Sequence, residues 1–272
     1  MAAIDPMHQF LIHKVVELPP ISTPVGALDL SITNSVVAMM SGALLICAFF
    51  MLSAKRQIVP DRLQALGESV YGLVDGTLVG PIIGDKGRPY LPFVFTIFMM
   101  VLTFNMMGVL LAVGNLAGLE LTFTVTAQLA VTATLAVLTF LSVVVIGFWK
   151  NGLKFFTLFV PSGVPVLILP LVVVIEIISF MVRPLTLAMR LFGNMIGGHV
   201  VMNIFASFAV ALGLFGMTGG LATLGLLGSG LSLAMVVALT GLELVVAFLQ
   251  AFVFAALACV YLNEVVNLGH GH

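Results

Sequence analysis

The chain has 272 residues, of which 61% are apolar and only 8% are charged. Soluble domains contain roughly a quarter charged residues, so this apolar fraction cannot all be buried in one soluble core. A soluble enzyme and a disordered tail are therefore excluded, and a formal net charge of -1 provides no basic surface for nucleic acid. The sequence has no nucleotide-binding, hydrolase or metal-ligand motif, so we expect no cofactor and no metal.

The first 33 residues carry several charged residues and prolines and lack the continuous apolar segment of a cleaved signal peptide, which is therefore not expected. We expect 1–33 to be an N-terminal segment on the outside. Apolar stretches follow at about 34–54, 90–113 and 121–149. Each is long enough to cross a hydrocarbon core of about 30 Å as a helix. Between the first two, apolar residues at helical spacing over 62–79 favour a short amphipathic helix at the membrane interface; a plain loop is the alternative.

The last two apolar stretches, about 166–215 and 221–266, are longer than one crossing requires. At 1.5 Å per residue the first would form a helix of about 75 Å, more than twice the hydrocarbon thickness. Each must break, bend or tilt, and a glycine-rich turn at 213–230 separates them. We therefore expect an all-α membrane protein in one domain, 1–272, with about five crossings over 34–149 and 166–266 and a strongly tilted C-terminal hairpin.

Basic residues indicate the orientation in the membrane. Seven of them fall between stretches one and two or between three and four: Lys55, Arg56, Arg62, Lys86, Arg88, Lys150 and Lys154. Loops rich in Lys and Arg lie on the cytoplasmic side. The pattern predicts an outside N-terminus and a cytoplasmic C-terminus.

Ionisable residues at membrane depth are the main candidates for function. The hairpin stretches contain Glu176, Arg183, Arg190, His199, Glu243 and Glu264. A charge at the centre of a bilayer costs about 3 kcal/mol on insertion scales, so such residues face protein or water and by default mark a site. For Arg183 and Glu264 the alternative is that their charged ends only reach back to the interface.

Spacing places these groups on helix faces. Three residues of the first hairpin helix are seven apart and share one face: Glu176, Arg183 and Arg190. Asn194 extends this stripe, whereas His199 falls on the opposite face of a continuous helix. The last helix carries a second polar side formed by Glu243, Gln250, Asn263 and Glu264.

Arg190 is best suited to be a fixed positive charge, because an arginine does not release its proton in a protein. No Asp or Glu lies three or four residues from it, so its counter-charge is expected on another chain. Glutamate and histidine side chains can instead take up and release protons.

One segment carries a family resemblance. Pro184-Leu-Thr-Leu-Ala-Met-Arg190-Leu-Phe-Gly-Asn194-Met, preceded by Glu176 and followed by Gly198-His199, resembles the signature of subunit a of the F-type ATP synthases. The similarity extends over nearly the whole chain and includes His8-Gln9-Phe10 and the segment 249–254.

This resemblance implies the stator subunit of the F0 sector, which has no catalytic chemistry of its own. It implies two offset proton half-channels, with Arg190 as the essential arginine that faces a carboxylate on the c-subunit ring. Asn194 and Gln250 match polar positions near that arginine. Glu176, His199 and Glu243 match half-channel positions, and Arg183, Asn263 and Glu264 are further candidates. His199 and Glu243 are exchanged relative to some bacterial members, so which of them takes the proton first stays open.

The implied partners are the c ring, the b subunits of the peripheral stalk, the F1 sector indirectly, the lipid bilayer, and protons rather than Na⁺ as the transported ion. The implied location is a bacterial inner membrane, with a mitochondrial relative as the alternative. Two other functions stay open on the residues alone. A self-contained proton-coupled secondary transporter would favour repeated halves, which the sequence does not show. A passive scaffold would use the polar stripe only to hold partner helices.

Overall fold

The computed structural model describes residues 14–16, 21–23, 26–28, 31–55, 57, 59–116, 125–160, 164–165, 167–218 and 222–268. The chain forms two compact units, each made of three separate segments. The first unit comprises Met1–Ala43, Thr103–Gln128 and Phe192–Leu249. The second comprises Leu44–Leu102, Leu129–Leu191 and Gln250–His272. The single membrane domain expected from the sequence stays a prediction.

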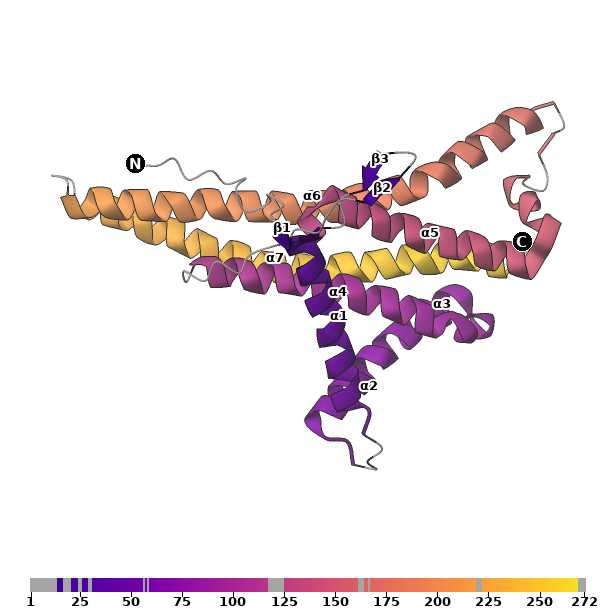
Figure 1. The fold of residues 1–272 in the computed structure, drawn as a ribbon, viewed down its shortest axis with the longest axis horizontal. Helices are drawn as coiled ribbons and strands as arrows, with labels where there is room; N and C mark the ends of the chain where they lie inside the picture. The colour runs from indigo at the N-terminus through magenta and orange to yellow at the C-terminus, as the bar shows by residue number, and fades with distance from the viewer. Residues whose placement is uncertain are drawn as a thin grey trace. The chain divides into compact units, whose positions relative to one another are not determined.

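Five helices correspond to the five predicted apolar stretches (Figure 1): α1 Asn34–Ser53, α4 Leu91–Leu116, α5 Leu129–Asn151, α6 Leu169–Thr218 and α7 Ala222–Val266. Five helices of the described residues are long and apolar enough to cross a membrane. The all-α membrane fold is thereby confirmed. Residues 121–124 of the predicted third stretch lie outside the described residues.

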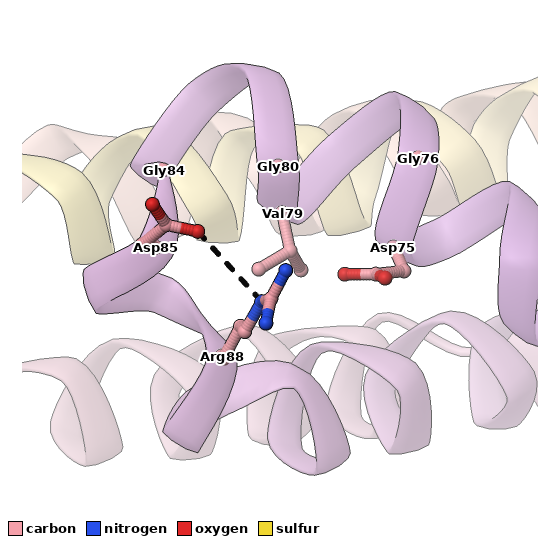
Figure 2. A pocket seen from close by; sticks show the side chains of 7 residues that line it. All are labelled: Asp75, Gly76, Val79, Gly80, Gly84, Asp85 and Arg88. Atoms are coloured by element: carbon pink, nitrogen blue, oxygen red, sulfur yellow. Dashed lines mark ion pairs between the residues drawn. The ribbon is translucent and has the colours of Figure 1, made fainter.

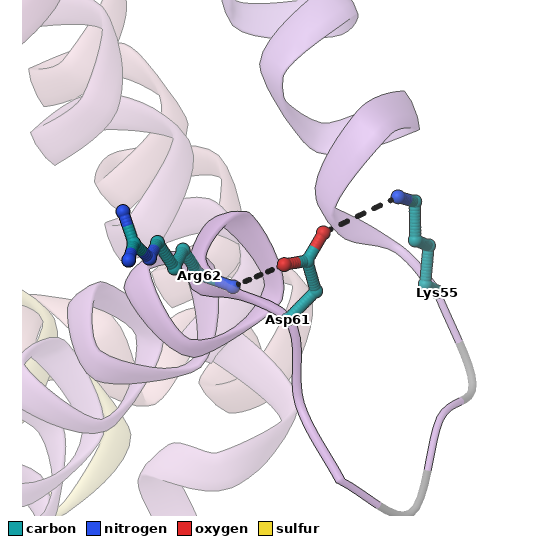
Figure 3. Close-up of polar contacts among 3 residues, drawn as sticks. All are labelled: Lys55, Asp61 and Arg62. Carbon is teal, nitrogen blue, oxygen red and sulfur yellow. Dashed lines mark hydrogen bonds and ion pairs between the residues drawn. The ribbon is translucent and has the colours of Figure 1, made fainter.

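The amphipathic segment predicted over 62–79 is helical. It consists of α2, Arg62–Val74, and a π-helix η2, Asp75–Val79, and is followed by α3, Gly80–Ile83, and the 3-10 helix η3, Asp85–Tyr90. Helix α2 begins at Arg62 because the Asp61 carboxylate accepts a hydrogen bond from the Arg62 backbone N–H at 2.8 Å (Figure 3). Lys55 Nζ lies 3.6 Å from the other oxygen of Asp61 and helps to hold this cap.

The second unit has the larger apolar core. Its fully buried side chains come from α2, η2, α4, α5, α6 and α7, and include Val74, Phe98, Leu191, Phe254 and Leu262. Side-chain amides hold the end of α7 in place. Asn151 at the end of α5 donates hydrogen bonds to the Val265 carbonyl at 2.7 Å and the Gly147 carbonyl at 3.2 Å. Asn267 donates to the Ile83 carbonyl at 3.3 Å.

In the first unit, the end of α6 packs closely on the start of α7. A Cβ at Gly225 would lie 2.5 Å from the Gly216 Cα, so this approach requires a glycine. The Ser229 hydroxyl donates to the Ala209 carbonyl at 2.7 Å across the same pair of helices. The predicted glycine-rich turn at 213–230 is thus mostly helical, because its glycines let two helices approach instead of forming a loop.

Helix α6 is continuous over its 50 residues. The sequence left three possibilities for this long stretch, a break, a bend or a tilt, and the break is excluded. Pro184 lies inside the helix, where it removes one backbone donor.

The first unit also contains two antiparallel strand pairs that the sequence analysis did not predict. β1, Lys14–Val16, pairs with β4, Ile32–Thr33, and β2, Ile21–Thr23, pairs with β3, Gly26–Leu28.

Candidate functional site

The ionisable residues of the hairpin helices fall into two groups, one in each unit. His199 and Glu243 belong to the first unit, together with Asn194. The second unit contains the other six predicted site residues: Glu176, Arg183, Arg190, Gln250, Asn263 and Glu264. The predicted roles of these residues stay predictions.

His199 and Glu243 form a buried pair in the first unit. Their side chains are 0% and 5% exposed, and His199 Nε2 lies 3.5 Å from Glu243 Oε1. This separation is slightly longer than a direct hydrogen bond, so a small rotation or one water suffices to connect the two groups. Both side chains can bind a proton, and the pair is therefore chemically able to pass one.

Gly198 leaves the space that the Glu243 carboxylate occupies. A Cβ at this position would lie 2.8 Å from Glu243 Oε1 and 3.2 Å from its Cδ. Any side chain at position 198 would push the carboxylate aside. The glycine that precedes His199 thus belongs to the same site as the pair.

Arg183 and Glu264 form an ion pair in the second unit, between Arg183 Nη1 and Glu264 Oε2. Their side chains are 20% and 32% exposed. The Arg183 guanidinium also lies 5.4 Å from the centre of the Phe180 ring and 4.9 Å from that of Tyr261, within range of cation–π attraction. The two charged side chains thus pair with each other. The alternative, in which they reach back to the membrane interface, stays open.

Arg190 is in a different environment from Arg183. Its side chain is exposed, and no carboxylate of the described residues forms an ion pair with it. Glu176, on the same helix, is half-buried and likewise forms no ion pair within the described part of the chain. Of the two arginines on α6, one is neutralised inside the chain and the other presents its charge outward.

The predicted polar residues differ in burial. Asn194 is exposed, and Gln250 is buried with 4% exposure. Asn263 is half-buried, and its side-chain oxygen accepts a hydrogen bond from the Asn267 amide.

Two of the most deeply buried polar residues of the first unit were given no role in the sequence analysis. Asn105 of α4 is 0% exposed and donates a hydrogen bond to the Ala247 carbonyl at 3.2 Å, one turn beyond Glu243. Thr126 is 1% exposed. An asparagine inside a long apolar stretch was the available signal, because a buried amide at membrane depth requires hydrogen-bonding groups.

A hollow of about 340 Å³ lies around η2 and η3 in the second unit, and none of the predicted site residues lines it (Figure 2). Its lining residues are Asp75, Gly76, Val79, Gly80, Gly84, Asp85 and Arg88. Arg88 Nε lies 3.8 Å from Asp85 Oδ1, and both side chains are mostly exposed to solvent. Such a solvated ion pair contributes little energy, and we assign no chemistry to the hollow.

Comparison with known proteins agrees with the resemblance. The model of the family described as ATP synthase A chain matches residues 35–263. A relative from Nitrobacter hamburgensis named ATP synthase subunit a is 44% identical over 267 residues, which cover 98% of this chain and 100% of the relative. Proteins of the same name from Rhodopseudomonas palustris (strain BisB18) and Rhizobium johnstonii are each 46% identical over 269 residues, covering 98% of this chain and 100% and 99% of the relatives. This chain therefore belongs to the ATP synthase A chain family, the a subunits of the F0 sector, and is a multi-pass membrane protein.

Proposed function

We propose that this chain is the stator that couples proton movement to rotation of the c ring and hence to ATP synthesis. Two offset half-channels would lead protons to and from the carboxylates of the ring. Arg190 lies between them in this proposal and faces each ring carboxylate as it passes.

The observation that carries this proposal is that no carboxylate among the described residues pairs with Arg190. Its guanidinium is exposed and has no carboxylate partner among the described residues, whereas Arg183 is paired with Glu264. A permanent cation attracts a carboxylate and favours its ionised form. It also repels a proton that would otherwise cross directly from one half-channel to the other.

The buried pair of His199 and Glu243 supplies a proton relay for one half-channel. The 3.5 Å separation of Nε2 and Oε1 is close to the range in which a proton is transferred directly or through one water. Glu176 would serve the other half-channel. Asn194 and Gln250 would form hydrogen bonds with water or with a ring carboxylate near Arg190. Either His199 or Glu243 can take the proton first in this relay.

The partners follow from this function. They are the c ring at Arg190, the b subunits of the peripheral stalk, the F1 sector indirectly, and lipid around the apolar helices. We place the chain in a bacterial inner membrane with the N-terminus outside and the C-terminus in the cytoplasm. Support comes from the basic residues, which gather between the first and second and between the third and fourth apolar stretches; the second of these regions includes the 3-10 helix η5, Gly152–Phe159.

Replacement of Arg190 in the whole ATP synthase tests the proposal. In inverted membrane vesicles that contain the assembled complex, Arg190→Ala is expected to abolish ATP synthesis driven by a proton gradient. Arg190→Lys is also expected to be severely impaired, because a lysine can lose its proton where an arginine does not. Arg88→Ala is the matched control, since this arginine is exposed and lies in the short 3-10 helix η3, to which we assign no chemistry. Normal gradient-driven synthesis by Arg190→Ala would refute the proposed function.

A further inference from the structure

Helix α6 carries two arginines seven residues apart, and their surroundings differ. The helical rise places Arg183 and Arg190 about 10 Å apart along the axis, and a spacing of seven turns them by only about 20° around it. Both therefore belong to one side of α6 in the second unit. Only Arg183 has a carboxylate partner within the described residues, which is Glu264 on α7.

We propose that Glu264 is a positioning residue that neutralises and holds Arg183, so that the positive field met by a ring carboxylate is confined to Arg190. The inference rests on the proposed function of Arg190. It assigns to the contact between Arg183 and Glu264 an electrostatic task in ion translocation, in addition to any contribution to folding.

Four side chains form the contact, and their arrangement fixes the guanidinium in place. Phe180 and Arg183 are three residues apart on α6, and Tyr261 and Glu264 are three residues apart on α7. The guanidinium carbon lies 5.4 Å and 4.9 Å from the two ring centres while Nη1 pairs with the carboxylate. Two ring contacts and a charge-assisted hydrogen bond hold the Arg183 guanidinium against its own chain, where it is not free to pair with a carboxylate of another subunit.

The end of α7 has other attachments, so it does not depend on this ion pair for its position. The Asn151 amide binds the Val265 carbonyl at 2.7 Å, and the Asn267 amide binds the Ile83 carbonyl at 3.3 Å. Leu262 and Val265 are 0% exposed in the apolar core. Removal of Glu264 should therefore leave the helix in place and mainly change the charge around Arg183.

Loss of Glu264 would leave a second permanent cation on the same side of α6. A ring carboxylate would then be held ionised over a longer arc, and its protonation at the next half-channel would be delayed. The two partners are not equivalent in this respect. A glutamate that loses its arginine can bind a proton and become neutral, whereas an arginine that loses its glutamate stays charged.

This asymmetry predicts a distinctive pattern among variants. The assay is gradient-driven ATP synthesis per assembled complex in inverted vesicles, with the amount of complex measured in the same membranes. We expect Glu264→Gln to lower the rate at least fivefold and Arg183→Gln to change it less than twofold. The double variant, with both residues changed to Gln, is expected to return to within about twofold of the parent, because the extra cation is gone. Glu264→Asp should retain most of the activity.

A purely structural contact would behave differently, and the result would overturn the inference. Breaking one contact from either side should then impair Arg183→Gln and Glu264→Gln alike, and the double variant should not recover. Normal activity of Glu264→Gln would overturn it as well. If Glu264→Gln prevents assembly, the inference requires that the additional Arg183→Gln change restores both assembly and synthesis. All these variants retain Arg190, so their outcome is separate from that of Arg190→Ala, which alone decides the proposed function.

Discussion

Replacement of Gly198 by alanine should slow proton passage without harming the fold. The new Cβ would lie 2.8 Å from Glu243 Oε1, and relaxation to an ordinary carbon–oxygen contact of about 3.3 Å moves the carboxylate by about 0.5 Å. Taken along the line to His199, this displacement lengthens the 3.5 Å separation to about 4.0 Å. Alanine is also a better helix former than glycine by about 1 kcal/mol, so the variant should not be less stable.

The effect on the pair can be calculated from this displacement. With an effective dielectric constant of about 20, the attraction between a protonated His199 and an ionised Glu243 weakens by at most about 0.6 kcal/mol. An energy of this size is about a threefold change in an equilibrium constant at 25 °C. We therefore expect Gly198→Ala to reduce proton conduction two- to threefold, measured through the F0 sector in vesicles stripped of F1.

Two comparisons make this prediction specific. Gly241→Ala is the matched control, because it lies on α7 two residues before Glu243 and a Cβ there would meet nothing within 4 Å. Glu243→Gln should itself reduce conduction strongly, and Gly198→Ala should have little further effect in that background. Unchanged conduction in Gly198→Ala, or an equal loss in Gly241→Ala, would refute the proposed role of the space beside Glu243.

Two further predictions concern the packing of the second unit. Gly147→Ala should destabilise the solubilised complex by about 1–3 kcal/mol, because its Cβ would lie 2.5 Å from Val265 Cγ1 and 2.7 Å from the Phe155 ring. Gly76→Ala is the control, because a Cβ there would meet nothing within 4 Å. Equal thermal unfolding midpoints for the two variants would contradict the prediction. Asn151→Ala should cost about 1 kcal/mol through the loss of its hydrogen bond to the Val265 carbonyl at 2.7 Å, seen as a lower unfolding midpoint with unchanged conduction per complex. An unchanged midpoint would show that this bond contributes nothing.

The extents of the membrane helices could be predicted because they depend on the length of apolar runs alone. The first stretch was predicted over 34–54 and forms α1, Asn34–Ser53. The amphipathic segment was predictable from its periodicity, whereas the Asp61 cap that begins it was found only in the structure. The strand pairs between Lys14 and Thr33 were not, since runs of two or three residues carry too little pattern to distinguish a strand from a loop.

The pairing of site residues could not be predicted, because it depends on the register between two helices. Arg183 and Glu264 are 81 residues apart in the sequence, and a shift of one residue in either helix would turn a side chain by about 100°. Periodicity placed Arg183 and Arg190 on one stripe and gave no reason to distinguish them. The glycine contacts near Gly225, which set how the start of α7 meets the end of α6, were likewise interpreted as a turn.

The two arginines differ in how the cost of a charge at membrane depth is met. An arginine near the bilayer centre costs about 3 kcal/mol or more on insertion scales. Glu264 and two aromatic rings offset this cost for Arg183 within the chain. No carboxylate of the described residues does so for Arg190, and its side chain is exposed. If Arg190 lies at that depth, its charge is the one that the chain itself does not compensate. We therefore expect a carboxylate supplied by a neighbouring subunit to stabilise the assembly most at Arg190.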